Sequence, residues 1–314
     1  MTKPTYLEPS NLGTKDYWES LYRTELLNHA HDPSDTGTAW FDDSDAETKL
    51  VDFLSDPERQ RDFSLSEEET TFLDLGTGNG QLLFALRDNG WRGQMLGVDY
   101  SGMSVDFARK LERGRRRESC EEGEEGRNGE ERVDIRFHVH DILHDSPFAL
   151  HHAPAVPERV RRNRGWDVVL DKGTFDAVSL CAETLPPTIA TTDFINGKGG
   201  ERTEAQPRRV NELYPPTILA LLKPGGLFLV TSCNWTEEEL RSWFAEPSYT
   251  DSEIVRAVGG RGQGGEDAQT DTETETCWGF EVVGRVPYRS FSFGGIKGQT
   301  ISSLCFRKIP LRDR

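Results

Sequence analysis

The sequence predicts an α/β fold in which a mostly parallel central sheet is flanked by helices and closed by a terminal antiparallel strand pair. The first observation is residues 71–84, where an apolar run ends at Leu75, three glycines follow and an apolar helical pattern begins. The second is a series of later apolar runs that each lead to an acid, and the third is a pair of strand-like segments near the C-terminus. A strand, a glycine turn and a helix in succession bring bare backbone close to a nucleotide-like ligand.

The glycine loop indicates which kind of ligand to expect. Gly76, Gly78 and Gly80 have no side chain and therefore permit positive φ and close approach of a ligand. A dinucleotide-binding fingerprint places its third glycine one residue later, where this chain has Gln81. Asp74 stands two residues before the first glycine and is expected to lie near the ligand. For this loop taken alone, a glycine turn without a ligand is the alternative.

Two further expected strands lead to an acid. Asp99 ends the first and lies 19 residues after Gly80, close to the ~20 that separate such a loop from a ribose-binding acid. The alternative is an aspartate that only starts a turn. The second strand, residues 133–139, alternates as a strand should and precedes Asp141. An acid there can accept a hydrogen bond from an adenine amino group, while Ile142 covers the ring.

A fourth acid follows the apolar residues 166–170. Ligands of open α/β sheets bind at the carboxyl ends of the strands. We therefore expect Asp171 to face the same crevice as the glycine loop and the two earlier acids. Asp167, at the beginning of the same strand, is expected to be a solvated edge residue.

The N-terminal residues 1–70 are predicted to form a helical cap on one domain, residues 71–314. Within the cap, residues 1–13 are expected to be a mobile tail, Thr14 to cap a helix, and residues 44–47 to form a capping box. Several polar stretches of the domain bury too little apolar area to offset the cost of ordering them. They are predicted to be loop insertions, near residues 113–132, 145–164, 182–208 and 257–276.

The C-terminal third is expected to complete the sheet. Residues 213–222 have a helical pattern and are followed by a turn at 223–226. Thr236 opens a capping box with the glutamate three residues later. Residues 280–288 and 300–306 are expected to form the terminal antiparallel pair.

Composition restricts the partners. The net charge of −17 disfavours nucleic acid, which needs clustered Lys and Arg, and is compatible with a basic protein partner. Five scattered cysteines and the histidines around His140 match no metal-site spacing, so no metal is expected. No apolar run approaches the ~18 residues of a membrane span. We expect a cytoplasmic monomer that binds neither membrane nor nucleic acid.

Two motifs narrow the interpretation. Residues 171–177 read Asp-Lys-Gly-Thr-Phe-Asp-Ala, and residues 232–236 read Ser-Cys-Asn-Trp-Thr. With the glycine loop, they make the chain resemble class I methyltransferases that use S-adenosylmethionine, and among these the protein-lysine methyltransferases that modify elongation factor 1-alpha. The resemblance also covers Tyr17-Trp18, Trp40-Phe41, residues 97–101, 141–143 and 293–295. Thr77 departs from it, because such loops usually carry Cys there.

The resemblance implies a Rossmann-like class I methyltransferase fold, S-adenosylmethionine as cofactor and a protein lysine as methyl acceptor. Asp74 would bind the ammonium of the cofactor, Asp171 would orient the amine that is methylated, and Trp235 and Tyr100 would be aromatic walls for the lysine stem. Trp40 could line the ligand site or be a plain core anchor. The implied cofactor-binding residues are Trp40, Asp74, Gly76, Gly78, Gly80, Asp99, Tyr100, Asp141, Ile142 and Asp171.

The implied chemistry is in-line attack of a lysine amine on a sulfonium methyl group. A lysine with pKa ~10.4 is neutral in only roughly one molecule in 2,500 at pH 7, so the site must favour proton loss. Two alternatives stay open: a class I methyltransferase for a small molecule or RNA, and a cofactor-binding scaffold without activity. Amino-group methyltransferases for nucleobases or glutamine carry Asn/Asp-Pro-Pro-Tyr/Phe after the fourth strand, where this chain has residues 171–174.

Overall fold

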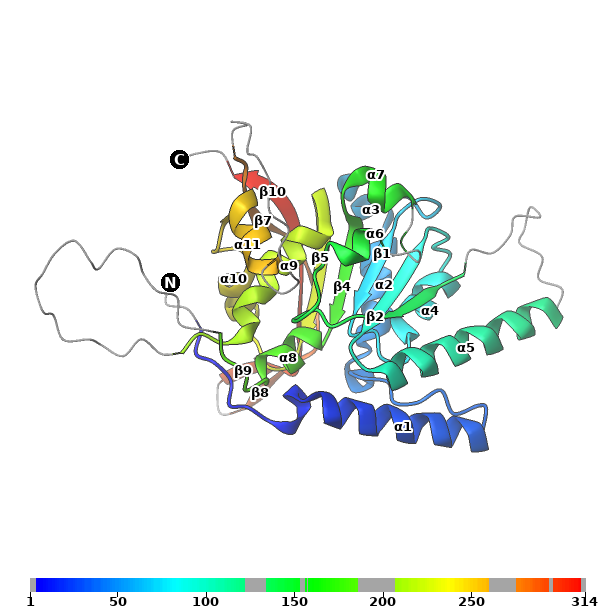
Figure 1. The fold of residues 1–314 in the computed structure, drawn as a ribbon. Helices are drawn as coiled ribbons and strands as arrows, with labels where there is room; N and C mark the ends of the chain where they lie inside the picture. The colour runs from blue at the N-terminus through cyan, green and yellow to red at the C-terminus, as the bar shows by residue number, and fades with distance from the viewer. Residues whose placement is uncertain are drawn as a thin grey trace, which may run out of the picture.

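The computed structural model describes residues 4–121, 134–152, 156, 158–185, 207–259, 275–293 and 296–311. Its eight-stranded sheet has the order β3-β2-β1-β4-β5-β10-β7-β6 (Figure 1). The five strands from β3 to β5 are parallel, β10 runs antiparallel to β5 and β7, and β6 runs antiparallel to β7. The predicted fold class and terminal antiparallel pair are therefore confirmed. The strands are β1 Phe72–Leu75, β2 Met95–Asp99, β3 Arg136–Val139, β4 Trp166–Lys172, β5 Leu222–Ser232, β6 Tyr249–Thr250, β7 Cys277–Val286 and β10 Ser302–Leu311.

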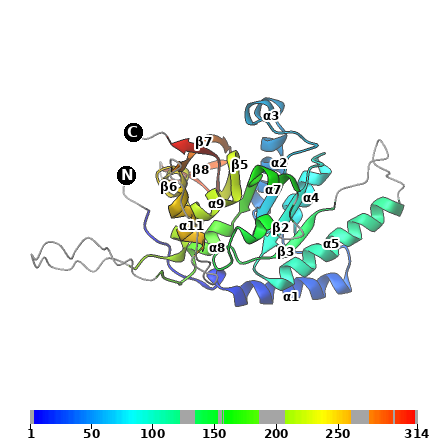
Figure 2. The same ribbon diagram turned by 45° about the horizontal axis from the view of Figure 1, so that its top comes forward.

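Helices cover both faces of the sheet because the side chains of the central strands alternate between two apolar cores. On β5, Leu227 and Leu229 join one core, while Phe228 and Val230 join the other. The first core also takes side chains from α1 (Lys15–His31), α2 (Ala46–Ser55), α4 (Gln81–Asp88) and α5 (Gly102–Glu121). The second takes them from α6 (Ala149–His152), α7 (Glu158–Asn163), α8 (Thr174–Ser179), α9 (Tyr214–Leu221), α10 (Glu237–Phe244) and α11 (Asp251–Gly259) (Figure 2). Burial on both faces is typical of a parallel sheet.

Smaller elements complete the described chain. They are α3 (Pro57–Phe63), the 3-10 turns η1 (Asn11–Gly13), η2 (Asp42–Ser44) and η3 (Val210–Leu213), and the hairpin of β8 (Ser290–Phe293) with β9 (Ile296–Gln299). The hairpin lies between β7 and β10 in the sequence. No helix in the described part of the chain is long and apolar enough to cross a membrane.

The N-terminal segment is ordered by packing, contrary to the predicted mobile tail. Tyr6 and Leu7 pack against the second core, and the Ser10 N–H donates to Leu180 O at 3.1 Å. The Tyr6 hydroxyl also donates to Glu212. Few residues carry this docking, and apolar side chains at irregular spacing give no periodic signal in the sequence.

Two predicted helix caps are wrong in detail. Helix α1 begins after Thr14, but the Thr14 hydroxyl donates to Asn11 O at 2.7 Å instead of capping the helix. The capping box at residues 44–47 does not form, because Asp45 occupies the N-cap position of α2 in the left-handed conformation. The Thr236 capping box on α10 is confirmed, with both reciprocal hydrogen bonds present.

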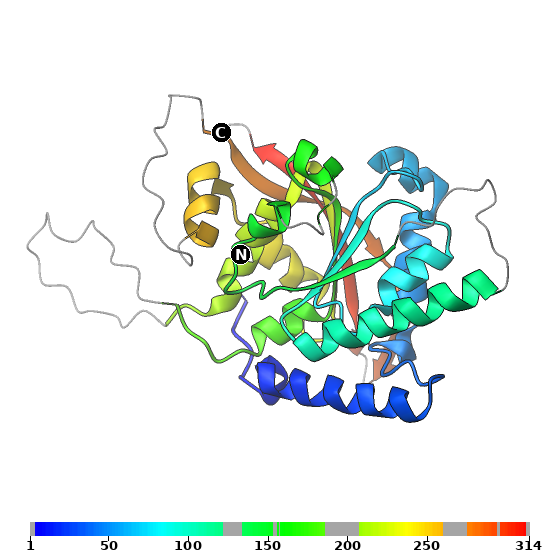
Figure 3. The same ribbon diagram turned by 45° about the vertical axis from the view of Figure 1, so that its right-hand side comes forward.

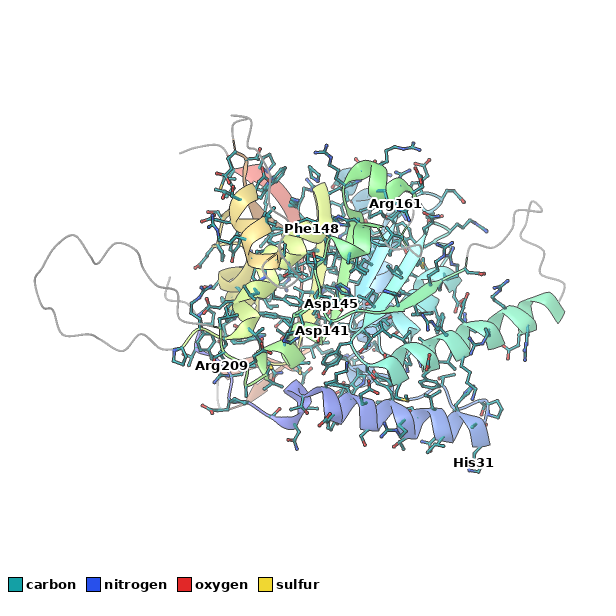
Figure 4. The ribbon with its side chains drawn as sticks, viewed as in Figure 1. His31, Asp141, Asp145, Phe148, Arg161 and Arg209 are labelled. Atoms are coloured by element: carbon teal, nitrogen blue, oxygen red, sulfur yellow. The ribbon has the colours of Figure 1, made fainter. Side chains whose placement is uncertain are left out.

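The predicted insertions contain more structure than their composition indicates. Helix α5 continues to Glu121, past the expected start of the first insertion. Residues 145–164 include α6 and α7, whose Leu150 and Val160 are fully buried (Figure 4 labels Phe148 and Arg161 in this segment). A few well-placed apolar side chains suffice, because tertiary packing supplies most of the stability of a short helix. Much of the other insertions lies outside the described residues.

The expected turn at residues 223–226 lies within β5. Leu222 pairs with Trp166 and Leu227 with Val168, so four residues of β5 oppose one of β4 and form an irregular bulge. A bulge absorbs extra residues without ending the strand. Helix α9 is confirmed, and the two prolines in its first turn fit there because the N–H groups of that turn have no partner within the helix.

Candidate active site

A cavity of about 240 Å³ lies at the carboxyl ends of β1, β2 and β4. Its wall combines strand ends from the domain with residues of the N-terminal segment and α1. Helix α1 lies beside α5 and runs past this end of the sheet (Figure 3). The cavity therefore forms only when the chain upstream of β1 has folded onto the domain.

Only the first glycine of the loop lines the cavity. Gly76 has φ 58°, and a Cβ there would collide with the Thr174 hydroxyl. A Cβ on Gly78 would lie 2.5 Å from the Tyr22 hydroxyl, and one on Gly80 would lie 2.7 Å from the Phe137 ring. The second and third glycines thus permit close packing of protein against the loop. Neither of them lines the cavity, so their contact with the cofactor stays a prediction.

Asp99 lies in the cavity wall at the place that the sequence predicts. It is 6 % exposed and accepts hydrogen bonds from Gly78 N at 3.1 Å, Ser101 N at 2.9 Å and the Ser104 hydroxyl at 2.9 Å. Burial raises the pKa of the Asp99 carboxyl, and the three donors oppose this shift. The same donors fix the orientation of the carboxylate at the end of β2.

Asp141 and Ile142 line the cavity beside Asp99, as predicted. Asp141 accepts from Leu143 N at 3.0 Å and from His144 N at 3.2 Å, so the segment after β3 folds around its carboxylate. Asp145 lies in the same segment and accepts from Asp141 N at 2.9 Å (Figure 4).

His140 is a site residue to which the sequence pattern assigns no role. It lines the cavity, is 4 % exposed, and its Nε2 has no hydrogen-bond partner among the described residues. Burial lowers the pKa of the imidazole, so the neutral ring is favoured. Its place directly between an alternating strand and Asp141 was the available signal.

Aromatic side chains from the N-terminal part form another wall. Trp40 and Tyr100 line the cavity as predicted, and they are joined by Trp18 and Tyr22 of α1. The Trp18 ring lies 5.3 Å from the Trp40 ring and 6.3 Å from the Tyr22 ring. The sequence of α1 predicts no role at a ligand site, because an aromatic pair four residues apart on a helix is ordinarily part of a core.

Asp171 does not line the cavity, contrary to prediction. Its carboxylate accepts from Thr174 N at 2.7 Å and from the Tyr214 hydroxyl at 2.6 Å, and it is 1 % exposed. Burial raises its pKa to about 7. Along β4, Asp171 follows Val169 by two residues, so both side chains point to the same face and into the second core.

The prediction that Trp235 is an aromatic wall of the site is also wrong. Trp235 is 3 % exposed, its ring lies 6.1 Å from Phe175 and 5.6 Å from Trp243, and its Nε1 donates to Ser179 Oγ at 3.2 Å. It is a core residue and no cavity wall. Asn234, the residue before Trp235 in the same turn, lines the cavity instead.

Asp176 is the acid of the 171–177 motif that reaches the cavity. It is 5 % exposed and accepts from Cys233 N at 2.8 Å and from the Ser232 hydroxyl. Burial raises the pKa of its carboxyl. Asp176 therefore ties α8 to the segment after β5 and places Cys233 and Asn234 in the same wall.

Asp74 lies behind the wall. The Thr77 hydroxyl donates to it at 2.7 Å, and burial raises its pKa to about 7. Lys172, at the end of β4, lines the cavity and donates from Nζ to Trp40 O at 3.1 Å. This lysine belongs to the motif at residues 171–177, whose pattern predicts no role for it.

The cavity and its sheet can be compared with known proteins. The methyltransferase domain family matches residues 66–276, so the fold and site define a methyltransferase. Protein-lysine N-methyltransferase EFM4 of Saccharomyces cerevisiae is 33% identical over 302 residues, covering 96% of both chains. EEF1A lysine methyltransferase 2 of Danio rerio is 27% identical, covering 98% of this chain and 92% of the relative. The chain belongs to this family of protein-lysine methyltransferases.

A solved structure is also similar. Magnesium protoporphyrin IX methyltransferase from Synechocystis PCC 6803, described with bound SAM, is 10% identical, covers 93% of this chain and 96% of that one, and has a TM-score of 0.39.

The cofactor of the family is S-adenosylmethionine, and the cavity wall fits it. Asp99 offers a carboxylate at the end of β2, and Ile142 and Leu143 offer an apolar surface after β3. The unpartnered Nε2 of His140 requires a polar group from a ligand or water. The predicted ribose partner Asp99 and the predicted cover of the adenine ring, Ile142, thus lie in the same cavity wall.

Proposed function

We propose that this chain methylates a lysine side chain of elongation factor 1-alpha. The observation that carries the proposal is a single cavity that joins the nucleoside-type wall of Asp99 and Ile142 to the segment Cys233–Asn234. The names of the relatives supply the candidate substrate. The net charge of −17 suits a basic protein partner. We further propose that the enzyme acts in the cytoplasm as a monomer.

Bound S-adenosylmethionine supplies a methyl group on a sulfonium with a good leaving group, so the protein mainly positions and desolvates. The aromatic rings of Trp40 and Tyr100 offer a surface to the lysine stem. An apolar wall lowers the pKa of an entering amine, which promotes loss of its proton.

We assign the orienting role to Asp176 rather than to Asp171. Asp176 lines the cavity and Asp171 does not. Cys233 N and the Ser232 hydroxyl donate to the Asp176 carboxylate and hold it in place. The raised pKa of this carboxylate makes it a better proton acceptor near neutral pH. The buried Asp171 would then stabilise the motif from the core, where it accepts a hydrogen bond from the Tyr214 hydroxyl.

The test is transfer of a labelled methyl group from S-adenosylmethionine to purified elongation factor 1-alpha, followed by mass mapping of the modified residue. We expect label on lysine. Tight cofactor binding without transfer would favour the scaffold alternative. Transfer to RNA or to small metabolites, with none to the protein, would contradict the proposal.

A further inference from the structure

Lys172 is a half-buried lysine in the wall of the cavity, and neither the fold nor the proposed chemistry explains its charge there. It is the last residue of β4 and lines the cavity together with Gly76 and Thr174. An ammonium has three donors. Among the described residues, one hydrogen bond of Lys172 Nζ is present, to Trp40 O at 3.1 Å. A charged Lys172 in this wall therefore has donors beyond the one bonded to Trp40 O.

Two carboxylates accompany this ammonium, the buried Asp74 and the half-buried Glu47. Burial lowers the pKa of Lys172, and the charges of Glu47 and Asp74 oppose that shift. Glu47 comes from the first turn of α2 and Asp74 from β1, so three elements bring these charges together. Neither carboxylate lines the cavity, whereas Lys172 does. The cluster therefore presents a positive charge to the ligand and keeps its negative charges behind the wall.

We propose that Lys172 binds the carboxylate at the amino-acid end of the cofactor and thereby positions it, with Glu47 and Asp74 keeping the lysine charged. This rests on the cofactor assigned above. It replaces the prediction that Asp74 contacts the ammonium of the cofactor directly. The Trp40 carbonyl and the Phe41 ring, whose centroid lies 6.0 Å from Nζ, restrict the lysine to this place.

The alternative is a purely structural lysine that joins β4 to the segment before α2. Both readings predict that removing Lys172 lowers stability. They differ in the ligands they affect, because only the proposed role depends on a carboxylate in the ligand. Decarboxylated S-adenosylmethionine keeps the nucleoside and the sulfonium and lacks only that group.

The experiment measures dissociation constants of Lys172→Met for S-adenosylmethionine and for its decarboxylated analogue by calorimetry. Loss of a charge-assisted hydrogen bond should weaken S-adenosylmethionine binding by about 10- to 100-fold. Affinity for the analogue should stay at the wild-type value. Lys172→Arg should restore part of the discrimination between the two ligands, because it keeps the charge.

Lys308→Met is the matched control. Lys308 is a buried ammonium that donates to Leu219 O and Leu222 O, and it lies outside the cavity wall. Its removal should leave both dissociation constants unchanged. Glu47→Gln should weaken S-adenosylmethionine binding and spare the analogue, because Glu47 acts through Lys172.

Equal weakening for both ligands in Lys172→Met, or no weakening for either, would overturn the proposal. Should Lys172→Met fail to fold, Glu47→Gln and Lys172→Arg carry the same comparison between the two ligands. Failure of the proposed substrate is separable, because these measurements need no methyl acceptor.

Discussion

The aspartates at the two ends of β4 have pKa values shifted in opposite directions. At its beginning, Asp167 accepts from Thr71 N and the Thr71 hydroxyl, both at 2.8 Å, and pairs with Lys223. Burial raises the pKa of Asp167, but these donors outweigh it and hold the pKa below its usual range. At the carboxyl end, burial prevails and raises the pKa of Asp171 to about 7.

At the beginning of β4, hydrogen bonds and an ion pair stabilise the charged form of an aspartate. At the carboxyl end, burial disfavours the charged form. Asp167 is predicted to be solvated, yet it is 4 % exposed and joins β4 to Thr71, which precedes β1, and to Lys223 of β5. Asp74, Asp99 and Asp176 share the raised pKa of Asp171 at the other end. Clusters of perturbed acids in a cleft are typical of functional sites.

The largest effect is expected from Asp176→Asn. If this carboxylate orients the amine and receives its proton, kcat should fall by about 10²- to 10⁴-fold, while the dissociation constant of the cofactor stays near the wild-type value. Steady-state kinetics with elongation factor 1-alpha and calorimetry measure the two quantities. Asp171→Asn is the comparison, since it should alter stability more than turnover. The reverse ranking would restore Asp171 to the role first predicted for it.

Asp99→Ala should weaken cofactor binding by about 10- to 100-fold, because it removes a charged acceptor from the cavity wall. The fold should be retained, which circular dichroism can check. Calorimetry with S-adenosylmethionine gives the affinity. Unchanged affinity would remove Asp99 from the cofactor site and leave it only as the acceptor for the glycine loop.

Asp167→Ala should change stability and not cofactor binding. It should lower the free energy of unfolding by about 1–3 kcal/mol, since Thr71 loses its acceptor and Lys223 its partner, with allowance for the partial exposure of Lys223. Cofactor affinity should not change. Urea unfolding and calorimetry together provide the check. A loss of affinity without a loss of stability would erase the contrast between the two ends of β4.

The last prediction concerns the dependence of stability on pH. Asp74 and Asp171 have pKa values of about 7 in the folded chain against 3.8 when unfolded, so the folded state binds more protons between these values. Their contribution to stability is full below pH 4 and is lost as pH rises through about 7. The cofactor-free protein should therefore become less stable to urea from pH 5.5 to 8, and Asp171→Asn should reduce that slope. An unchanged slope in the variant would show that Asp171 does not titrate in this range.

The sequence by itself determined the mostly parallel sheet with its terminal antiparallel pair, the glycine loop and the acids at the strand ends. These features are local: hydrophobic periodicity, glycine spacing and the chain distance from Gly80 to Asp99 need no knowledge of the partner surfaces. For the same reason it indicated the family and the cofactor. It also placed Trp40, Gly76, Asp99, Tyr100, Asp141 and Ile142 in the cavity wall.

Only the tertiary structure decided which side of each strand end meets the ligand. Neighbouring residues of a strand point to opposite faces, so Lys172 lines the cavity and Asp171 enters the core. The docking of residues 4–13 and of the α1 aromatics likewise depends on surfaces far away in the sequence. Sequence motifs specify which side chains are near a site, while packing of the elements selects those that reach it.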